Sequence, residues 1–336
     1  MKALYALPFL LSLLFANTVH AQEVEYTQYY LNLAGVNSGF TGIEDYVDVK
    51  VGVRQGWNNF GEKSSNVFLS AYGTIKNSNL SPLKNSSLRL SNPDYVNKIL
   101  SNKELRRKQG IGGMIRSYDV GLYKSTRVIA NYAYHLPISK KLNWSLGATM
   151  GFVNQKVNFT GYTVRDEIND AFYQQLIRAK QGSENLVIAD FGSAVYSNNF
   201  YLGVSSTNLL LKQVGGFNLL DSDQPVRYSI QTAGNIRLSN DLLFNPGLKI
   251  VSTSGYDLNW TVNSRFRYKD LIYAGMAYEG NVKVSALFGL YINNTYSINY
   301  AYDKYLSALN NFNVSVHEVV IGIALVNRYG LKPKFW

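Results

Sequence analysis

The sequence of 336 residues contains no cysteine and only three histidines. Without cysteine the chain has no disulfide, no thiolate metal ligand, no cysteine nucleophile and no lipid attached to an N-terminal cysteine. Charge is also scarce, because Asp, Glu, Lys and Arg make up 16% of the residues, whereas soluble domains carry about 25%. Yet no segment after residue 21 approaches the ~20 continuous apolar residues that a membrane helix needs. These absences disfavour thiol chemistry and a helical membrane protein.

The first 21 residues have the features of a secretory signal peptide. Lys2 gives a basic start, residues 4–15 are apolar, and small residues precede a cleavage site after Ala21. Gln22 follows the site, and the apolar run is too short to anchor the chain as a helix. Export, low charge and 26 tyrosines together favour a transmembrane β-barrel over a secreted enzyme.

Hydrophobic residues alternate with polar ones at the period of a β-strand in several segments. Val47, Val49, Val51 and Val53 share one face of such a segment, and its opposite face carries Lys50 and Arg54. Residues 257–268 place three charged and three other polar side chains on a single face, which is hard to bury in a β-sandwich core. We therefore predict an outer-membrane barrel with the valines facing lipid and Lys50 and Arg54 facing the lumen. A secreted β-sandwich is the alternative.

The alternation, bounded by turn residues, gives fourteen expected strands, an even number as a single-chain outer-membrane barrel requires. Their ranges are 46–57, 66–76, 110–119, 126–136, 143–154, 189–196, 199–207, 226–238, 241–252, 256–268, 271–279, 281–292, 295–303 and 314–325. Connections after even-numbered strands are mostly short, whereas odd-numbered strands precede long loops at 155–188, 208–225 and 304–313. Short turns should face the periplasm and long loops the exterior. The 33 residues of segment 77–109 break this rule.

The parts outside the expected strands have distinct compositions. Short helices are expected at 166–179, in the long exterior loop, and at 93–108, in the basic insert 77–109. That insert should lie in the periplasm, and we expect it to contact acidic partners through Arg106, Arg107 and Lys108. Residues 22–45 should fold inside or under the barrel, their amides bonding strand residues such as Arg54. Residues 326–336 form a C-terminal tail.

No catalytic constellation is evident in the sequence. After the leader is removed only His135 and His317 remain, and His135 lies within an expected strand, where a structural role is favoured. His317 and Glu318 are adjacent on one strand, so their side chains should point to opposite faces. The basic residues are dispersed along strands rather than clustered with stacking aromatics, which disfavours nucleic-acid binding. We predict no enzyme and no cofactor.

Three parts of the chain carry recognisable motifs. The first is YTQYYLNLAGVNSGFTG at residues 26–42, followed by VRQGW at 53–57; the last are INYAYD at 298–303 and SVHEVVIGIAL at 315–325. Between them lies DFGSAVYSNNFYLGVSSTNLL at 190–210. These motifs resemble those of the PorP/SprF family of Bacteroidetes outer-membrane proteins. Two prolines of the first family motif are replaced, by Leu33 and Ser38. The matching positions are Gln28, Tyr29, Asn32, Asn37, Gly42, Arg54, Trp57, Tyr300, Tyr302, Asp303, His317 and Glu318.

The resemblance implies a fourteen-stranded barrel in the outer membrane that serves the type IX secretion system. Such a barrel would bind, export or anchor a secreted surface protein with a C-terminal sorting domain, for example a gliding adhesin. It could also contact a periplasmic lipoprotein or a component of the secretion ring, besides outer-membrane lipids. The competing hypothesis is a diffusion porin or specific channel, for which a polar lumen is equally expected.

Overall fold

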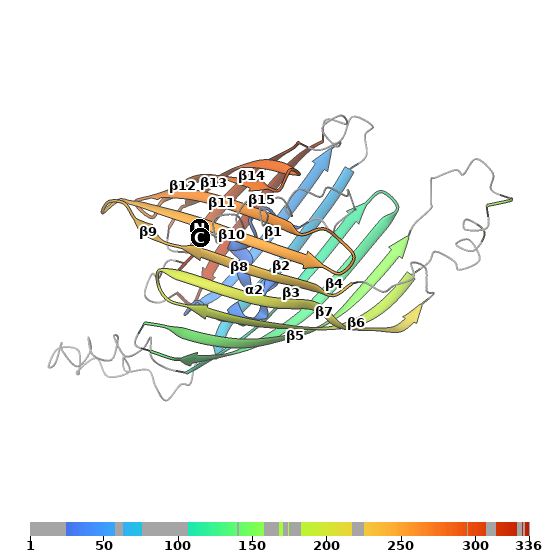
Figure 1. Ribbon diagram of the computed structural model, residues 1–336, viewed down its shortest axis with the longest axis horizontal. Coiled ribbons are helices and arrows are strands. Elements are labelled where there is room, and N and C mark those ends of the chain that lie inside the picture. The colour runs from blue at the N-terminus through green and yellow to red at the C-terminus, as the bar shows by residue number, and fades with distance from the viewer. Residues whose placement is uncertain are drawn as a thin grey trace, which may run out of the picture.

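A computed structural model shows a closed antiparallel β-barrel (Figure 1). It describes residues 25–57, 63–75, 107–139, 141–157, 168–170, 174, 183–216, 225–293, 295–306, 314–327, 331 and 333–335. Within them, no helix is long and apolar enough to cross a membrane. The strands are β1 Val47–Trp57, β2 Lys63–Ile75, β3 Lys108–Val120, β4 Tyr123–Pro137, β5 Asn143–Val157, β6 Ser183–Tyr196, β7 Phe200–Gly216, β8 Arg227–Gly234, β9 Ile236–Arg237, β10 Leu242–Thr253, β11 Asn259–Tyr268, β12 Ile272–Glu279, β13 Lys283–Tyr291, β14 Tyr296–Tyr305 and β15 Ser315–Leu325.

The strand number agrees with the prediction, because β9 continues β8 after an interruption at Asn235 and both pair with β10. The barrel therefore has fourteen strands. Two strands extend farthest beyond their expected ranges: β6 begins at Ser183 and β7 continues to Gly216. The expected long loops at 155–188 and 208–225 thus contribute residues to the wall.

Pairing of the first strand with the last closes the barrel. β1 lies between β2 and β15, with Arg54 directly opposite Glu318 in the β1–β15 ladder. On the opposite side of the barrel β10 pairs with β11, so the sheet is continuous around the barrel. Because an antiparallel barrel closes only when its first and last strands meet, motifs from opposite ends of the sequence lie side by side.

The two faces of β1 differ as the alternation predicted. Lys50 and Arg54 face the lumen and are 8% and 2% exposed, whereas Val51 faces outward and is 39% exposed. Val49 and Val53 lie on the same outer face as Val51 and are half-buried. Outward apolar side chains face lipid in such a barrel, and inward polar ones must find partners in the lumen.

The connections define two ends of the barrel. At one end, which we call the short-turn end, lie the turns after β4, β6, β9, β11 and β13, together with the start of β1 and the end of β15. At the other, the long-loop end, lie the connections after β5, β7 and β14. The sequence analysis predicted that short turns face the periplasm, and this orientation stays a prediction.

The expected helices fall almost entirely on residues outside the described part. Of the segment 93–108, the structure describes only the last two residues. Lys108 is the first residue of β3 and pairs with His135, so the helix prediction is wrong at that position. Within 166–179 the structure describes only residues 168–170 and 174, where the backbone nitrogen of Gln174 donates to the Asp170 carbonyl over 2.9 Å.

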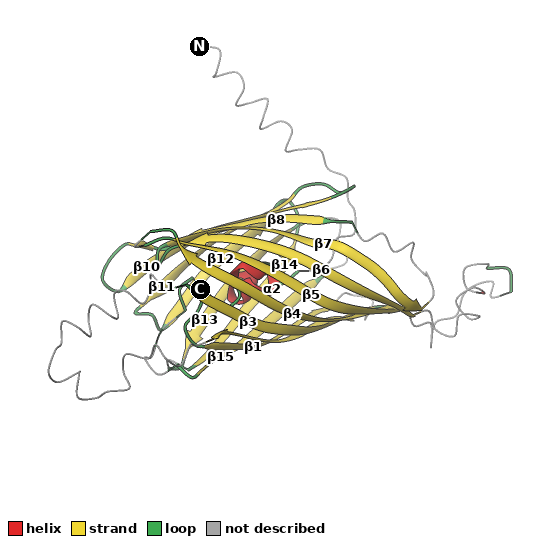
Figure 2. Ribbon diagram, turned by 90° about the horizontal axis from the view of Figure 1, so that it is seen from below, coloured by secondary structure: helices red, strands yellow, loops and turns green. Residues whose placement is uncertain are grey.

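The N-terminal segment, by which we mean residues 25–46, lies in the barrel lumen (Figure 2). It forms three short helical turns, η2 Tyr29–Asn32, α2 Leu33–Val36 and η3 Ser38–Phe40. The C-terminal residues fold back toward the same lumen, where Phe335 is buried with its ring 4.9 Å from that of Tyr201. The Lys334 backbone nitrogen donates to Glu44 over 2.9 Å, which ties the tail to the N-terminal segment.

Candidate functional site: the N-terminal segment in the lumen

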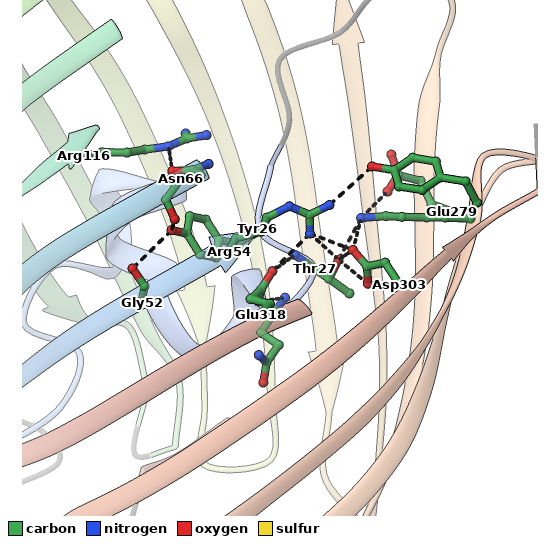
Figure 3. Close-up of polar contacts among 12 residues, drawn as sticks. Tyr26, Thr27, Gly52, Arg54, Asn66, Arg116, Glu279, Asp303 and Glu318 are labelled. Atoms are coloured by element: carbon green, nitrogen blue, oxygen red, sulfur yellow. Dashed lines mark hydrogen bonds and ion pairs between the residues drawn. The ribbon is translucent and has the colours of Figure 1, made fainter. Parts of the chain in front are cut away.

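Five ionisable side chains, each from a different strand, surround Thr27 in the lumen (Figure 3). We call them the charged clamp: Arg54 of β1, Glu279 of β12, Lys283 of β13, Asp303 of β14 and Glu318 of β15. Adjacent strands place these side chains within reach of each other because inward positions recur at every second residue. These strands are neighbours on the side of the barrel where the first strand, β1, pairs with the last strand, β15.

Arg54 is the central cation of the charged clamp. Its Nη1 donates to Asp303 Oδ2 over 2.6 Å and lies 3.4 Å from Glu318 Oε2. Nη2 donates to the Tyr305 hydroxyl over 3.4 Å. Asp303 and Glu318 are both completely buried. Since a buried carboxylate is costly without a counter-ion, Arg54 stabilises both acids in the lumen, and Lys283 is a second cation beside Asp303.

Thr27 joins the N-terminal segment to this clamp. Its hydroxyl donates to Asp303 over 2.8 Å and accepts from Lys283 Nζ over 2.7 Å. The backbone nitrogens of Thr27 and Gln28 each donate to one oxygen of Glu318 over 2.9 Å. Glu318 thereby holds the segment in two adjacent places. Hydrogen bonds to a charged group are worth about 1.5–3 kcal/mol each, more than neutral ones.

The amide side chains of the N-terminal segment were expected to bond Arg54, and this prediction is wrong. Arg54 reaches the Thr27 hydroxyl, 3.4 Å away, whereas the amides contact other strands. Gln28 Oε1 accepts from the Tyr273 hydroxyl over 3.2 Å, and Asn32 Nδ2 lies 3.6 Å from the Met114 sulfur. The threonine carries no motif signal in the sequence, which explains why it was missed.

The opposite wall holds the N-terminal segment through uncharged groups. We call this set the neutral seat; it comprises Asn131 and His135 of β4, Ser145 and Gly147 of β5, Gly192 of β6, and Gln231 of β8. Asn131 Nδ2 donates to the Ala34 carbonyl over 2.7 Å, and the Ser145 hydroxyl donates to the Gly39 carbonyl over 2.5 Å. Asn37 Nδ2 donates to Gln231 Oε1 over 3.1 Å. The bonds from Asn131 and Ser145 satisfy buried backbone carbonyls of the segment, and the Asn37–Gln231 bond pairs two buried amide side chains.

His135 is part of this seat. Its Nε2 lies 2.7 Å from the Thr41 carbonyl oxygen, and its Nδ1 lies 2.8 Å from the Tyr196 hydroxyl. A carbonyl oxygen only accepts, so Nε2 donates to Thr41 and Nδ1 accepts from Tyr196. Nε2 therefore holds the N-terminal segment to the wall, and the bond from Tyr196 of β6 to Nδ1 fixes the orientation of the ring.

Two wall glycines allow the N-terminal segment to touch the backbone of the barrel. A Cβ atom on Gly192 would lie less than 3.0 Å from the Asn37 side chain, and one on Gly147 less than 3.0 Å from the Ser38 carbonyl. Gly42, in the segment itself, has φ +70, where a side chain is strained. The motif residues Asn37 and Gly42 thus fit the segment to the wall.

Aromatic rings fill the space between the two walls. Asn263 Nδ2 donates to the Tyr29 hydroxyl over 2.9 Å, and the Arg265 guanidinium lies 3.5 Å from the centre of the Tyr30 ring. Burial raises the pKa of Tyr30 to about 12, although Arg265 lowers it. The Tyr26 hydroxyl donates to the Asn66 carbonyl over 2.5 Å. The segment therefore contacts the wall on both sides of the lumen.

Four of the motif residues lie on the outer face instead: Trp57, Tyr300, Tyr302 and His317. His317 Nδ1 is hydrogen-bonded to the Tyr300 hydroxyl over 2.7 Å, and its ring lies 5.4 Å from Trp57 and 5.2 Å from Tyr302. Glu318 points into the lumen, so the two neighbours do face opposite sides. Outward aromatic residues near the end of a strand, such as Trp57 on β1, are typical of the girdle where a barrel meets the membrane interface.

The three basic candidates in the insert do not share one environment. Arg106 lies outside the described residues, and Arg107 is exposed. Lys108 is engaged within the barrel, where its Nζ donates to the Ile43 carbonyl over 2.7 Å and lies 3.7 Å from Asp45. A contact with an outside partner through Lys108 would have to displace these bonds.

Glu279 and Lys283 were also missed by the sequence reasoning. Their charges are 3.3 Å apart and flank the tight turn between β12 and β13. The signal that could have found Lys283 is its place on the alternating inward face with Ser285, since an isolated cation there needs an acid nearby. Across the described residues, no three acidic or imidazole side chains gather in a way that could hold a metal ion.

The family model described as type IX secretion system membrane protein PorP/SprF matches residues 18–323. The chain belongs to the PorP/SprF family. Most of its motif residues lie in the lumen: Gln28, Tyr29, Asn32, Asn37 and Gly42 belong to the N-terminal segment, and Arg54, Asp303 and Glu318 belong to the charged clamp. Among curated proteins, none matches this sequence.

Several solved structures are similar to this PorP/SprF protein in overall shape. The Pseudomonas putida toluene transporter TodX has 9% identity and a TM-score of 0.39, over 83% of this chain and 88% of its own. Acinetobacter baumannii outer membrane protein Omp33 has 11% identity and a TM-score of 0.44, over 85% of this chain and 100% of its own. A Pseudomonas aeruginosa FadL homologue has 10% identity and a TM-score of 0.42, over 86% of this chain and 92% of its own. Similarities this low carry no argument about function.

Proposed function

We propose that this outer-membrane barrel binds one secreted surface protein and exports it or anchors it at the cell surface. The observation that supports the proposal is the N-terminal segment, which crosses the lumen and is bonded to both walls. A lumen occupied in this way does not suit free diffusion of solutes, whereas it suits a barrel that acts through surfaces presented to other proteins. No catalytic step is part of the proposal.

The partner that fits the family is a secreted protein with a C-terminal sorting domain, such as a gliding adhesin. Loops on a rigid barrel are the usual place for binding, so the long-loop end is the proposed contact for this partner. The basic insert 77–109 leaves the barrel at the opposite end, where it would meet a periplasmic lipoprotein or a component of the secretion ring. The signal peptide, residues 1–21, would be removed during export.

Affinity purification from detergent-solubilised outer membranes tests the proposal. A tagged form of the protein should retain a secreted surface protein, identified by mass spectrometry, and deletion of residues 160–180 at the long-loop end should remove that partner. The control is a deletion of residues 80–104 at the short-turn end, which should keep the surface partner and weaken a periplasmic one. Retention of no secreted protein, together with free ion conduction, would favour the channel alternative.

A further inference from the structure

The outer faces of β15 and its two neighbours, β1 and β14, change from apolar to polar toward the long-loop end. Outward positions alternate with inward ones along all three strands. Taken across the strands in that direction, the paired outward residues are Val51, Ile321 and Ile298, then Val53, Val319 and Tyr300, then Gln55, His317 and Tyr302, and finally Trp57, Ser315 and Lys304. Such a change is expected where the hydrocarbon core of a membrane gives way to the lipid headgroups.

Four polar side chains lie together at the end of this face. We call them the outer donor patch: Trp57 of β1, Lys304 of β14, and Ser315 and His317 of β15. Ser315 lies opposite Trp57 in one ladder and opposite Lys304 in the other, so it occupies the centre of the patch. His317 is the next outward residue of β15, and its ring lies 5.4 Å from that of Trp57. Three adjacent strands therefore bring the four side chains to one place.

Each member of the outer donor patch can donate a hydrogen bond. The ammonium group of Lys304 and the indole N–H of Trp57 only donate, and the Ser315 hydroxyl can do so. His317 Nδ1 lies 2.7 Å from the Tyr300 hydroxyl. A phenol that accepted from Nδ1 would leave its own hydrogen without an acceptor in apolar surroundings, so Tyr300 donates and the neutral imidazole carries its hydrogen on Nε2. Nε2 is therefore a donor as well.

The positive charge of Lys304 is not balanced by an acid on the outer faces of these strands. Lys304 is exposed, and its cross-strand neighbours are Val284 of β13 and Ser315. Every residue of β1, β14 and β15 is described, and none of their outward positions holds Asp or Glu. Asp303 and Glu318 belong to these strands but face the lumen. A lysine ammonium group binds phosphate as a point charge.

We propose that the outer donor patch binds the anionic phosphate of a membrane lipid headgroup. Lys304 supplies the opposite charge, and the other three members donate to the phosphate oxygens. The place of the patch identifies the occupant, because the apolar outward residues next to it are those that contact acyl chains in such a barrel. A lipid whose chains lie along Val53 and Val319 carries its headgroup at the level of the patch. This inference goes beyond the proposed function and does not depend on it.

Native mass spectrometry of the purified barrel measures the affinity for added lipids. Dioleoylphosphatidic acid is the probe, and dioleoylphosphatidylcholine is the matched lipid, because it has the same acyl chains but its choline group balances the phosphate charge. The wild type should bind the phosphatidic acid more tightly. The double variant Lys304→Gln/His317→Gln should lose about tenfold in that affinity, or about 1.4 kcal/mol, because a charge-assisted hydrogen bond and a neutral one are removed. Lys304→Arg should retain the tight binding, because the charge is kept.

Lys124→Gln is the matched control. Lys124 lies on β4 at the long-loop end, where its side chain is 55% exposed and pairs with Asp119 at 3.9 Å. The same loss of charge there should leave the affinity for phosphatidic acid unchanged.

Three results would overturn the inference. The first is an unchanged affinity of the double variant, with the barrel folded as judged by its heat-dependent mobility in gels. The second is an equal loss of affinity in Lys124→Gln, because general charge and not the patch would then hold the lipid. The third is displacement of the lipid by inorganic phosphate at the same concentration, which would assign the patch to free anions.

Discussion

The charged clamp and the neutral seat hold the same N-terminal segment in different ways. In the clamp, Arg54, Asp303 and Glu318 are almost completely buried and depend on each other for charge compensation. In the seat, uncharged side chains such as Asn131 and Ser145 donate to backbone carbonyls, and glycines provide space. One wall therefore fixes the segment by charge, and the other fixes it by neutral hydrogen bonds and close packing.

The two modes should respond differently to mutation. Removing one member of a buried charge cluster leaves its partners uncompensated in a medium where the charge is poorly solvated. Removing one neutral hydrogen bond costs only about 0.5–1.5 kcal/mol, because the others remain in place. One substitution in the charged clamp should therefore release the N-terminal segment, whereas each substitution in the neutral seat should weaken its attachment by a small amount.

Arg54→Met should have the largest effect. The change leaves Asp303 and Glu318 buried without their main cation, a loss of about 3–5 kcal/mol for such pairs. The N-terminal segment should detach, so protease cleavage within residues 25–46 should accelerate while the barrel stays intact. Gln55→Met is the control, since Gln55 is the next residue on β1 and faces outward. Equal cleavage rates for both variants would show that the clamp does not hold the segment.

Gly192→Ala should have an intermediate effect. The new methyl group would overlap with Asn37 and the Gly39 nitrogen, and overpacking of this kind costs about 1–3 kcal/mol. The same cleavage assay should show faster cleavage than in the wild type and slower than in Arg54→Met. Gly234→Ala is the matched control, because its Cβ would meet nothing closer than 3.8 Å. A result as severe as that of Arg54→Met would contradict the distinction between the two walls.

Glu44→Gln should have the smallest effect. Burial raises the pKa of Glu44, although Lys334 lowers it, and glutamine still accepts from the Lys334 backbone nitrogen. A carboxyl group whose pKa is raised by folding binds its proton more tightly in the folded state. Its contribution to stability is present at low pH. It is lost as the pH rises from the pKa of the unfolded state to the higher pKa of the folded state. Wild-type thermal stability should show this decrease as the pH rises above the ordinary carboxyl pKa, and the variant should lack it. An identical pH profile would contradict the assignment.

The strand number was predictable because each strand alternates with period two. The missed extensions of β6 and β7 have a physical cause at Asp190 and Asn208. The register shifts between Ala189 and Phe191, and Asn208 adopts φ 59 while its nitrogen donates to Asp190 over 2.6 Å. Such a bulge reverses the sides on which residues face, so the alternation ends there although the strand continues.

The candidate site was only partly predictable. The motifs identified Arg54, Asp303 and Glu318 separately, but their meeting depends on the register that closes β1 onto β15. Thr27 lies between them without any pattern of its own, and Lys283 is recognisable only when its acidic partners are known. Sequence periodicity gives the face of each side chain, whereas the contacts across the lumen require the closed barrel.

The ion conductance of the purified wild-type protein in planar bilayers tests the central claim most directly. With the N-terminal segment bonded to both walls, the account predicts a barrel that is closed for most of the recording. Arg54→Met in the same bilayers should show frequent openings, which confirms that the protein has inserted. A steady, open conductance of the wild type equal to that of the variant would contradict the claim that the segment occupies the lumen.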